Sequence, residues 1–355
     1  MSKNKHRKQP VQIPNQQKFS PTPQAPVISL LDTMVDGREF ESLLKIKQVN
    51  IDLVAEIRRA LKEISGLRQR PNIAYLANVV NPNIKAVRSI EYSDDLPFSE
   101  LVNTVPANAK EIDVILVTPG GSGTQVAKFV DKLRPRFDTV AFILPNIAMS
   151  AGTILAMSGD EIVMTNSSYI GPVDPQVPNK DGIYVPAQAI LTLIEEIQAK
   201  GDTAIKKGVN PDWADLQILR QIDPKEIGNA INASKYSVEL VENYLHDYKF
   251  KSWITHSNGS PVTPGQRRQR ANEIANQLCK HSLWKTHDHG ITREIAWDVC
   301  KLKITHSETV IGLDRAIKRL WALFYWLFEN TPVFKTFVSE YYSLMRNDKS
   351  LITLK

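Results

Sequence analysis

Ser150 is a candidate nucleophile because of the residues around it. It follows a short apolar run and immediately precedes Ala151 and Gly152; with Ala148 these small residues leave room for a substrate. At the start of a helix, a serine hydroxyl has backbone N–H donors beside it for the negative charge that develops on a substrate oxygen. The alternative is a helix cap, since serine is a preferred residue there and needs no catalytic role.

A second turn could supply further N–H donors to the same developing negative charge. Thr118–Gly121 reads Thr-Pro-Gly-Gly, ends an apolar run and opens a helical pattern, so exposed N–H groups there can hold an anion. We expect Gly121 and Ala151 to donate to an oxyanion, with Gly120 in the same loop. Glycine could also serve only to relieve strain in the turn. A nucleotide cradle fits poorly because no third glycine and no Gly-Lys-Ser/Thr follows, and no cofactor is expected.

The elements that position these turns form a strand–helix–strand unit. Val114–Val117 and Val140–Leu144 are short apolar runs followed closely by proline or glycine, which is typical of strands buried on both faces of a parallel sheet. Between them, apolar residues recur at three- and four-residue spacing: Val126, Phe129, Val130 and Leu133. The pattern predicts an α/β protein with a parallel sheet.

The remainder of the chain suggests four regions. Residues 1–27 are rich in Lys, Gln, Asn and Pro, which predicts a disordered basic tail. Residues 28–71 carry a helical stripe, 72–305 hold the core with both turns, and 306–355 are expected to be a helical extension with a polar end.

The aromatic segment Leu320–Phe328 is much shorter than a bilayer-spanning helix, so no transmembrane segment is expected. Such a stripe either packs inside the subunit or covers a neighbouring one. We expect contact with a neighbouring subunit, and therefore a homo-oligomer.

Charge and cysteine content indicate which partners and which cellular compartment to expect. The formal net charge is +6, but Lys3, Lys5, Arg7, Lys8 and Lys18 all precede the first acidic residue, so the rest of the chain is close to neutral. A basic tail of this kind is more often a solvated arm than a specific nucleic-acid reader. The two cysteines imply no disulfide framework, and the N-terminus lacks the apolar core of a signal peptide. A cytoplasmic protein is the expectation.

Several motifs in order resemble the serine dehydrogenase proteinase family, a branch of the Clp-protease/crotonase superfamily related to signal-peptide-peptidase-like serine proteases. The motifs are Thr-Pro-Gly-Gly, Ala-Met-Ser-Ala-Gly-Thr, Gly-Asp-Glu-Ile-Val-Met, Gly-Pro-Val-Asp-Pro-Gln and Thr-His-Asp-His-Gly-Ile. The resemblance implies a Clp/crotonase-like spiral of ββα units, an oligomer and a peptide or protein substrate. It also implies Ser150 as nucleophile, with the N–H groups of Gly121 and Ala151 as oxyanion donors.

The general base departs from the Clp pattern. Counted from the serine, the position of the Clp histidine falls at about Asp174. His289, with Asp288 or Asp174 as its orienting acid, is the preferred base because histidine titrates near neutral pH without environmental help. His287 and His289 could equally be loop histidines at the surface.

Lysine is the other possible base, because relatives in the signal-peptide-peptidase branch use one. Lys235 and Lys180 are possible counterparts. Lys235 lies between Ser234 and Tyr236, with no evident apolar pocket to lower its pKa.

Together these features predict a serine hydrolase, acting as an ATP-independent peptidase without a metal or cofactor. An inactive oligomeric scaffold of the same fold is one alternative. A crotonase-type acyl-CoA enzyme, which uses paired N–H groups without a serine nucleophile, is another; Ser150 and the lack of an adenine-nucleotide signature argue against it.

Overall fold

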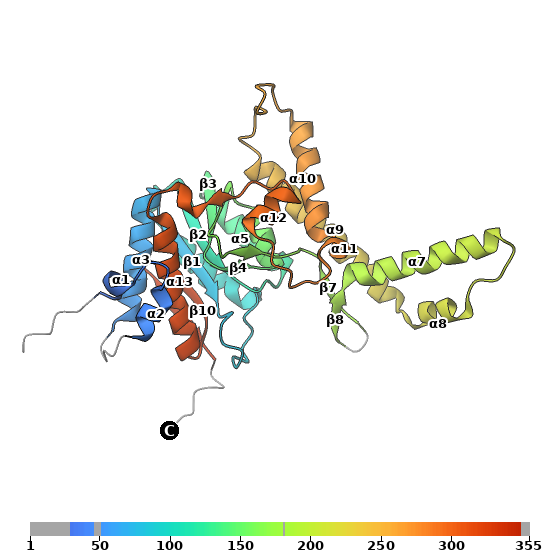
Figure 1. Ribbon diagram of the computed structural model, residues 1–355, viewed down its shortest axis with the longest axis horizontal. Helices are drawn as coiled ribbons and strands as arrows, with labels where there is room; N and C mark the ends of the chain where they lie inside the picture. Colours follow the sequence, from blue (N-terminus) through green and yellow to red (C-terminus); the bar gives the residue numbers. More distant parts are fainter. Residues whose placement is uncertain (1–28, 46–50, 180–181, 349–355) are drawn as a thin grey trace, which may run out of the picture.

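The structure, a computed structural model, describes residues 29–45, 51–179 and 182–348. Its described part is built on a seven-stranded sheet in the order β11-β10-β1-β2-β3-β5-β9 (Figure 1). The strands are β1 (Asn72–Ala77), β2 (Glu111–Val117), β3 (Thr139–Leu144), β5 (Glu161–Met164), β9 (Thr305–His306), β10 (Val333–Ser339) and β11 (Ser343–Asn347). The tail predicted at 1–27 lies outside the described residues.

The predicted strand–helix–strand unit is confirmed. Strand β2 leads into α5 (Gly123–Leu133), which returns the chain to β3, and β2 and β3 pair in parallel with Ile115 opposite Ile143. All apolar residues of β2 are buried because helices cover both faces of the sheet. The α/β class therefore follows from the periodicity of this region, while the spiral of ββα units stays a prediction.

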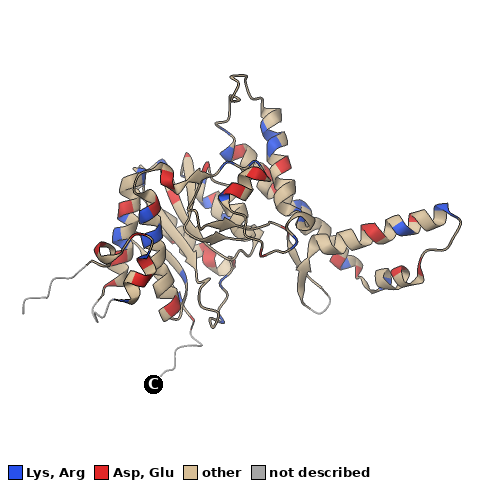
Figure 2. Ribbon diagram, in the orientation of Figure 1, with Lys and Arg blue, Asp and Glu red and all other residues tan. Residues whose placement is uncertain are grey.

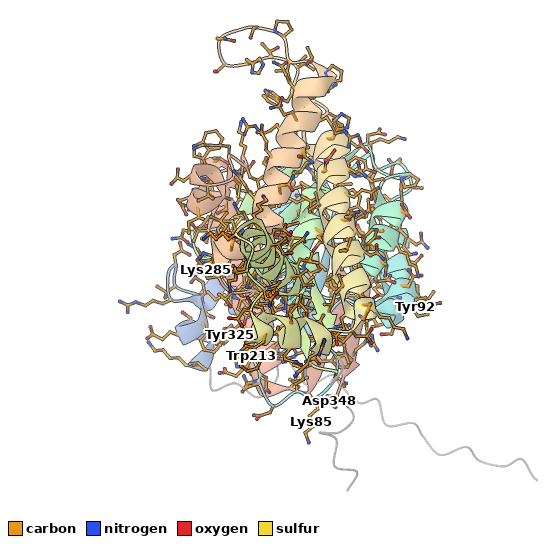
Figure 3. The ribbon with its side chains drawn as sticks, turned by 90° about the vertical axis from the view of Figure 1, so that its right-hand side faces the viewer. Lys85, Tyr92, Trp213, Lys285, Tyr325 and Asp348 are labelled. Carbon is orange, nitrogen blue, oxygen red and sulfur yellow. The ribbon has the colours of Figure 1, made fainter. Side chains whose placement is uncertain are left out.

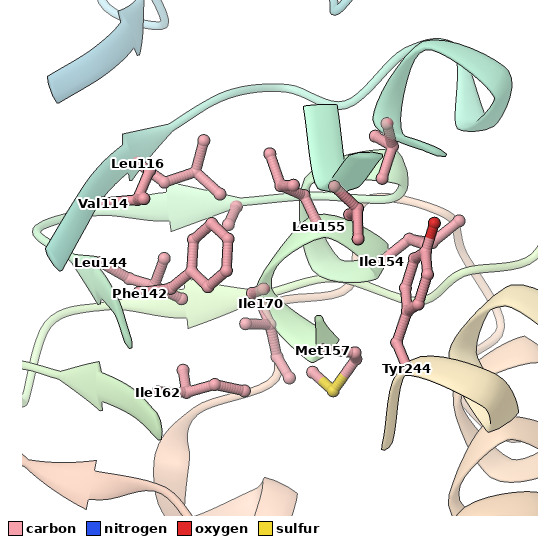
Figure 4. Close-up of a cluster of buried hydrophobic side chains, with 14 of the residues drawn as sticks. Val114, Leu116, Phe142, Leu144, Ile154, Leu155, Met157, Ile162, Ile170 and Tyr244 are labelled. Carbon is pink, nitrogen blue, oxygen red and sulfur yellow. The ribbon is translucent and has the colours of Figure 1, made fainter. Parts of the chain in front are cut away.

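One face of the sheet is covered by α4 (Asp95–Asn103), α5 and α6 (Ala151–Met157). Side chains that alternate along the strands, such as Val114, Leu116 and Phe142, pack there against Leu155 of α6 (Figure 4). Helix α6 is buried along its whole length, which fixes its first turn relative to the strand ends. The catalytic candidates therefore stand on a rigid layer.

The opposite face is covered by α3 (Leu53–Arg68) and α13 (Leu313–Asn330), flanked by α1 (Leu30–Thr33) and α2 (Glu39–Leu44) (Figure 1). The aromatic stripe lies on α13. Five of its members are buried in this chain, namely Leu320, Leu323, Phe324, Leu327 and Phe328, whereas Trp321, Tyr325 and Trp326 are half-buried. The expectation that the stripe covers a neighbouring subunit is therefore wrong. It forms an internal core because the sheet face beneath it is equally apolar.

The C-terminal region is not purely helical, contrary to expectation. After α13 the chain forms β10 and β11, and β10 pairs antiparallel with β1 while β11 pairs antiparallel with β10. Lys335 on β10 is fully buried, and its Nζ donates to both carboxylate oxygens of Asp94 at 2.9 and 2.8 Å. A buried strand containing a lysine resembles a polar tail in sequence because its charge partner lies far away in the chain.

Short elements complete the site region. Strands β4 (Ile147–Ala148) and β6 (Tyr169–Ile170) form a small parallel pair, while β7 (Gln176–Pro178) and β8 (Tyr184–Pro186) form an antiparallel one. Single turns lie at Tyr92–Asp94 (η1) and Ser307–Thr309 (η3).

The helices that follow β8 first form a projecting arm and then return to the body. Figure 1 shows α7 (Ala187–Lys206) and α8 (Trp213–Gln221) projecting from the body, and Figure 3 views this arm from its end, with Trp213 labelled. The chain returns through α9 (Pro224–Tyr244) and the π-helical turn η2 (Leu245–Lys249). It continues through α10 (Pro264–Cys279), α11 (His281–Trp284) and α12 (Arg293–Asp298).

Charged residues of both signs are interspersed on the helices at the left of the body (Figure 2). Within the described ranges, none of the helices combines the length and apolar character needed to cross a bilayer.

Candidate active site

The Gly-Gly turn after β2 requires glycine at both positions. Gly120 and Gly121 have φ values of 106° and 136°, a region that side chains disfavour. A Cβ on Gly121 would lie 2.4 Å from the carbonyl oxygen of Ile90, and a Cβ on Gly120 would lie 2.8 Å from Cβ of Ser150. The turn is therefore held between the Ile90 backbone and the serine.

The hydrogen bonds of this turn distinguish its two N–H groups. Ile90 N–H donates to the carbonyl of Gly120 at 2.7 Å, and Ser122 N–H donates to the carbonyl of Ile90 at 2.9 Å. In such a parallel bridge the N–H of Gly121 points away from Ile90. Gly120 N–H instead donates to Thr118 Oγ1 at 3.1 Å. Gly121 is thus the available donor, and the structure does not favour Gly120.

Ala151 supplies the second available N–H. It is the first residue of α6, so its N–H lies among the helix donors that have no acceptor one turn earlier. Within the described ranges, no protein acceptor is bonded to the N–H of Ala151 or of Gly121. A Cβ on Gly120 would lie 2.8 Å from Cβ of Ser150, so the loop that carries the Gly121 N–H packs against the turn that carries the Ala151 N–H.

Ser150 has a strained backbone. It joins β4 to α6 with φ 50° and ψ −116°, an uncommon conformation for a residue with a side chain. Its side chain makes no capping hydrogen bond, so the helix-cap alternative is not what the structure shows. A serine in a sharp, strained strand-to-helix turn is also the arrangement in which hydrolases of known mechanism hold their nucleophile.

Close contacts keep this turn in place. Gly152 fits against Thr118, since a Cβ there would lie 2.4 Å from the threonine Cγ2. Met149 N–H donates to the carbonyl of Thr118 at 3.0 Å, so the serine turn is bonded to the end of β2. Small residues beside the serine thus permit two strand ends to meet.

Asp174 contacts two histidines. Its carboxylate is fully buried, with Oδ1 2.8 Å from His287 Nδ1 and Oδ2 2.8 Å from His281 Nδ1. The hydrogen bond with Asp174 raises the pKa of His287 above its ordinary value. With Nδ1–H donating to the carboxylate, Nε2 of each ring is left to accept a proton. Both rings are partly exposed.

The segment around Gly171 connects these histidines to the serine turn. Gly171 N–H donates to the carbonyl of Ala148 at 3.3 Å, and a Cβ on Gly171 would touch Met149. Val173 N–H donates to the carbonyl of Leu278, and the following Asp174 reaches His281 just beyond. The nucleophile turn and the aspartate–histidine cluster are therefore attached to the same short stretch of chain.

Other residues predicted for the base lie differently. The ring centroid of His289 is 5.3 Å from that of Trp284, and Asp174 bonds to His287 and His281 rather than to His289. Asp288 and Lys235 are exposed. Lys180 lies outside the described residues.

His281 is the residue that sequence analysis missed. The chain contains only seven histidines, and an aspartate in the position of the Clp histidine leaves the site in need of an imidazole from elsewhere. Testing every histidine as a partner of Asp174 would have included His281. Within the described ranges, no cluster of His, Cys, Asp and Glu fits a metal ion.

Comparisons with known proteins identify one family and two relatives that are similar to this chain. Residues 45–223 match the model of a family described as ClpP-like SDH-type serine proteinase. An uncharacterised protein of Methanocaldococcus jannaschii is 32% identical over 243 residues, which cover 67% of this chain and 70% of that protein. A second uncharacterised protein of this organism is 27% identical over 213 residues, or 60% of this chain and 56% of that protein. The region matched by the family model includes Ser150 and Asp174, whereas His281 and His287 lie beyond it.

Proposed function

Since this chain belongs to the family of ClpP-like SDH-type serine proteinases, we propose that it hydrolyses peptide bonds with Ser150 as nucleophile. The observation that carries the proposal is the strained backbone of Ser150, in a turn that packs against the Gly120–Gly121 loop. Strain of this kind costs about 1–3 kcal/mol and persists only where surrounding structure enforces it. Because the serine does not cap α6, a nucleophilic role accounts for the conformation better than a structural one.

In the proposed first step, Ser150 Oγ attacks the carbonyl carbon of the scissile bond. The carbonyl oxygen becomes an oxyanion, which accepts hydrogen bonds from the N–H groups of Gly121 and Ala151. Donors of this kind act mainly on the transition state, and each contributes about 3–4 kcal/mol. The serine proton passes to a base, which then protonates the departing amine, and water releases the acyl group from the serine.

For the base we propose Nε2 of His287, in place of the sequence-based preference for His289. His287 has the buried carboxylate of Asp174 on its Nδ1, which fixes the tautomer that leaves Nε2 free to accept a proton. The carboxylate also stabilises the imidazolium formed during attack, consistent with the raised pKa of His287. No described residue is hydrogen-bonded to Ser150 Oγ. Catalytic hydrogen bonds often tighten only with substrate bound, so substrate would complete the contact.

His281 is proposed as a positioning residue. Its Nδ1 bonds to the second carboxylate oxygen, so it holds Asp174 in the plane that His287 requires. Both histidines bond to the same carboxylate, so replacing each in turn tests the assignment. Loss of His287 should abolish proton transfer, whereas loss of His281 should not.

The direct test of function is incubation with a mixture of unstructured peptides, followed by mass spectrometry of the products. Cleavage by the wild type and its loss in Ser150→Ala support the proposal. Absence of cleavage by a folded wild type across a broad peptide mixture would favour the inactive scaffold. Cleavage that survives Ser150→Ala would remove the serine from the mechanism.

A further inference from the structure

A large cavity lies at the end of the sheet opposite the serine. Its volume is about 900 Å³, and its wall includes Glu161 at the start of β5 and Thr305 in β9. The serine turn instead follows the carboxyl ends of the parallel strands, at Thr118 and Ala148. This cavity is therefore separate from the proposed catalytic site, and its volume is in the range of pockets that bind small molecules.

Three lysines on the wall lack a carboxylate partner. Lys249, Lys301 and Lys303 line the cavity, and none of them forms an ion pair with any residue that the structure describes. Partial burial lowers the pKa of Lys249 to about 8, because desolvation disfavours its charged form. A bound anion would compensate that cost.

The two acidic residues of the wall form their ion pairs with other cations, although their charge also acts on Lys249. Asp160 bonds to Arg134 and Lys251, each at 2.7 Å, and Glu161 bonds to Arg68. The fourth cation of the wall, Arg270, pairs with Glu273 at 2.9 Å. The cavity thus has an excess of positive charge that the phosphates of a ligand could neutralise. Lysine ammonium groups are well suited to bind phosphates.

Two tryptophans add flat apolar surfaces. Trp253 and Trp297 line the cavity, and the side chain of Trp297 is 53% exposed. The ammonium of Lys301 is 5.7 Å from the ring centroid of Trp297, so one position combines a cation and an aromatic face. Aromatic faces stack on planar heterocycles such as nucleic-acid bases.

Two backbone irregularities occur at the same wall. Lys301 has φ 54°, which is uncommon for a residue with a side chain, and Lys249 ends the π-helical turn η2. The first is a left-handed cap at the end of α12, in which Lys301 N–H donates to the carbonyl of Trp297 and Leu302 N–H to that of Ala296. The second is a feature that is frequent at functional sites. Each places one of the three lysines at the cavity.

We propose that this cavity binds a phosphorylated ligand with a planar ring, that is, a nucleotide. Lys249, Lys301 and Lys303 bind the phosphates, and Trp297 stacks on the ring. This proposal concerns binding only and does not depend on the activity of Ser150.

Isothermal titration calorimetry of the full chain at fixed ionic strength tests the proposal, with ATP, tripolyphosphate and adenosine as separate ligands. ATP should bind at one saturable site, and the other two at least about tenfold more weakly, since each offers only one type of contact. Tripolyphosphate binding as tightly as ATP would overturn the role of the ring. No saturable ATP binding at millimolar concentrations would overturn the site itself.

Variants separate the two types of contact. Lys301→Gln with Lys303→Gln should weaken ATP and tripolyphosphate at least about tenfold, whereas Trp297→Ala should weaken ATP alone. The matched control changes two exposed lysines on the arm, Lys206→Gln with Lys207→Gln, and should leave affinity unchanged. Equal losses in the two double variants would show non-specific charge attraction and contradict the proposal.

Discussion

Ser150 combines two properties that mutation can separate, a reactive hydroxyl and a strained backbone. The hydroxyl makes no capping bond, so Ser150→Ala should abolish turnover while changing the free energy of unfolding by no more than about 0.5 kcal/mol. Ser150→Gly should raise the free energy of unfolding by about 1 kcal/mol, since glycine adopts positive φ without strain. Urea titration measures both values. A destabilised glycine variant would show that the conformation is not strained.

Gly121 tests the oxyanion donors. Gly121→Ala places a methyl group 2.4 Å from the carbonyl oxygen of Ile90, so the N–H must turn away from the serine. Turnover should fall about 100-fold or more, with a small effect on KM. The matched control is Gly123→Ala, whose nearest neighbour, Leu240, is at an ordinary 3.7 Å; it should stay near wild type. A change in KM alone for Gly121→Ala would make this turn a substrate contact.

The pH dependence distinguishes the two histidines bonded to Asp174. Because this carboxylate raises the pKa of His287, activity should rise with pH through an apparent pKa above the ordinary value of about 6.5. His287→Ala should remove activity. His281→Ala should retain part of the activity, and the pH at which its activity falls on the acid side should differ from that of the wild type. Full activity in His287→Ala would exclude it as base, and loss in His289→Ala would restore the sequence-based preference.

The same shift predicts a pH-dependent stability. A histidine whose pKa is raised by folding stabilises the native state fully below its unfolded pKa, about 6.5, and this contribution is lost as pH rises through the folded value. The stability difference between wild type and His287→Ala should therefore shrink from pH 6 towards alkaline pH. Urea titrations across that range measure it, and a difference growing with pH would contradict the assigned bond.

At the scale of elements, the sequence predicts the units whose signals are local. Strand β2, helix α5 and strand β3 follow from apolar runs and helical spacing, and so do the positions of Ser150 and Gly121 at strand ends. Strands β10 and β11 were missed because polar residues interrupt both, and in β10 these are Lys335 and Thr336 between two apolar pairs. Lys335 becomes tolerable in a buried strand only through Asp94, 241 residues earlier. Similarly, Asp174 meets its histidines across 107 and 113 residues, a pairing that spacing cannot reveal.

Helix α13 provides a test of the internal core. Phe324 is fully buried between the helix and the sheet, so Phe324→Ala should lower the free energy of unfolding by about 3–5 kcal/mol without changing the mass of the assembly. Chemical denaturation and light scattering measure the two effects. If Phe324→Ala instead dissociated a complex without lowering the stability of the subunit, the stripe would lie in a subunit interface.

At the scale of the whole molecule, the arm α7–α8 is the surface that we propose for self-association. It projects from the body and exposes apolar residues, among them Ile205 (64%) and Trp213 (77%) (Figures 1 and 3). Exposed apolar residues that gather on one surface are typical of interaction sites, which is the reason for this proposal. Ile205→Asp with Trp213→Asp should lower the mass measured by sedimentation. Ile311→Asp, at a residue that is 94% exposed outside the arm, is the control. A wild-type monomer would contradict self-association.

The most direct test of Ser150 as an activated nucleophile is reaction of the native protein with a fluorophosphonate, followed by intact mass and peptide mapping. The reagent modifies only serines activated by a base and an oxyanion site. If Ser150 is the nucleophile, the protein should gain one adduct per chain, located on Ser150, absent in Ser150→Ala and formed far more slowly in His287→Ala. A folded wild-type protein that gains no adduct on Ser150, or an equal adduct in Ser150→Ala, would contradict it.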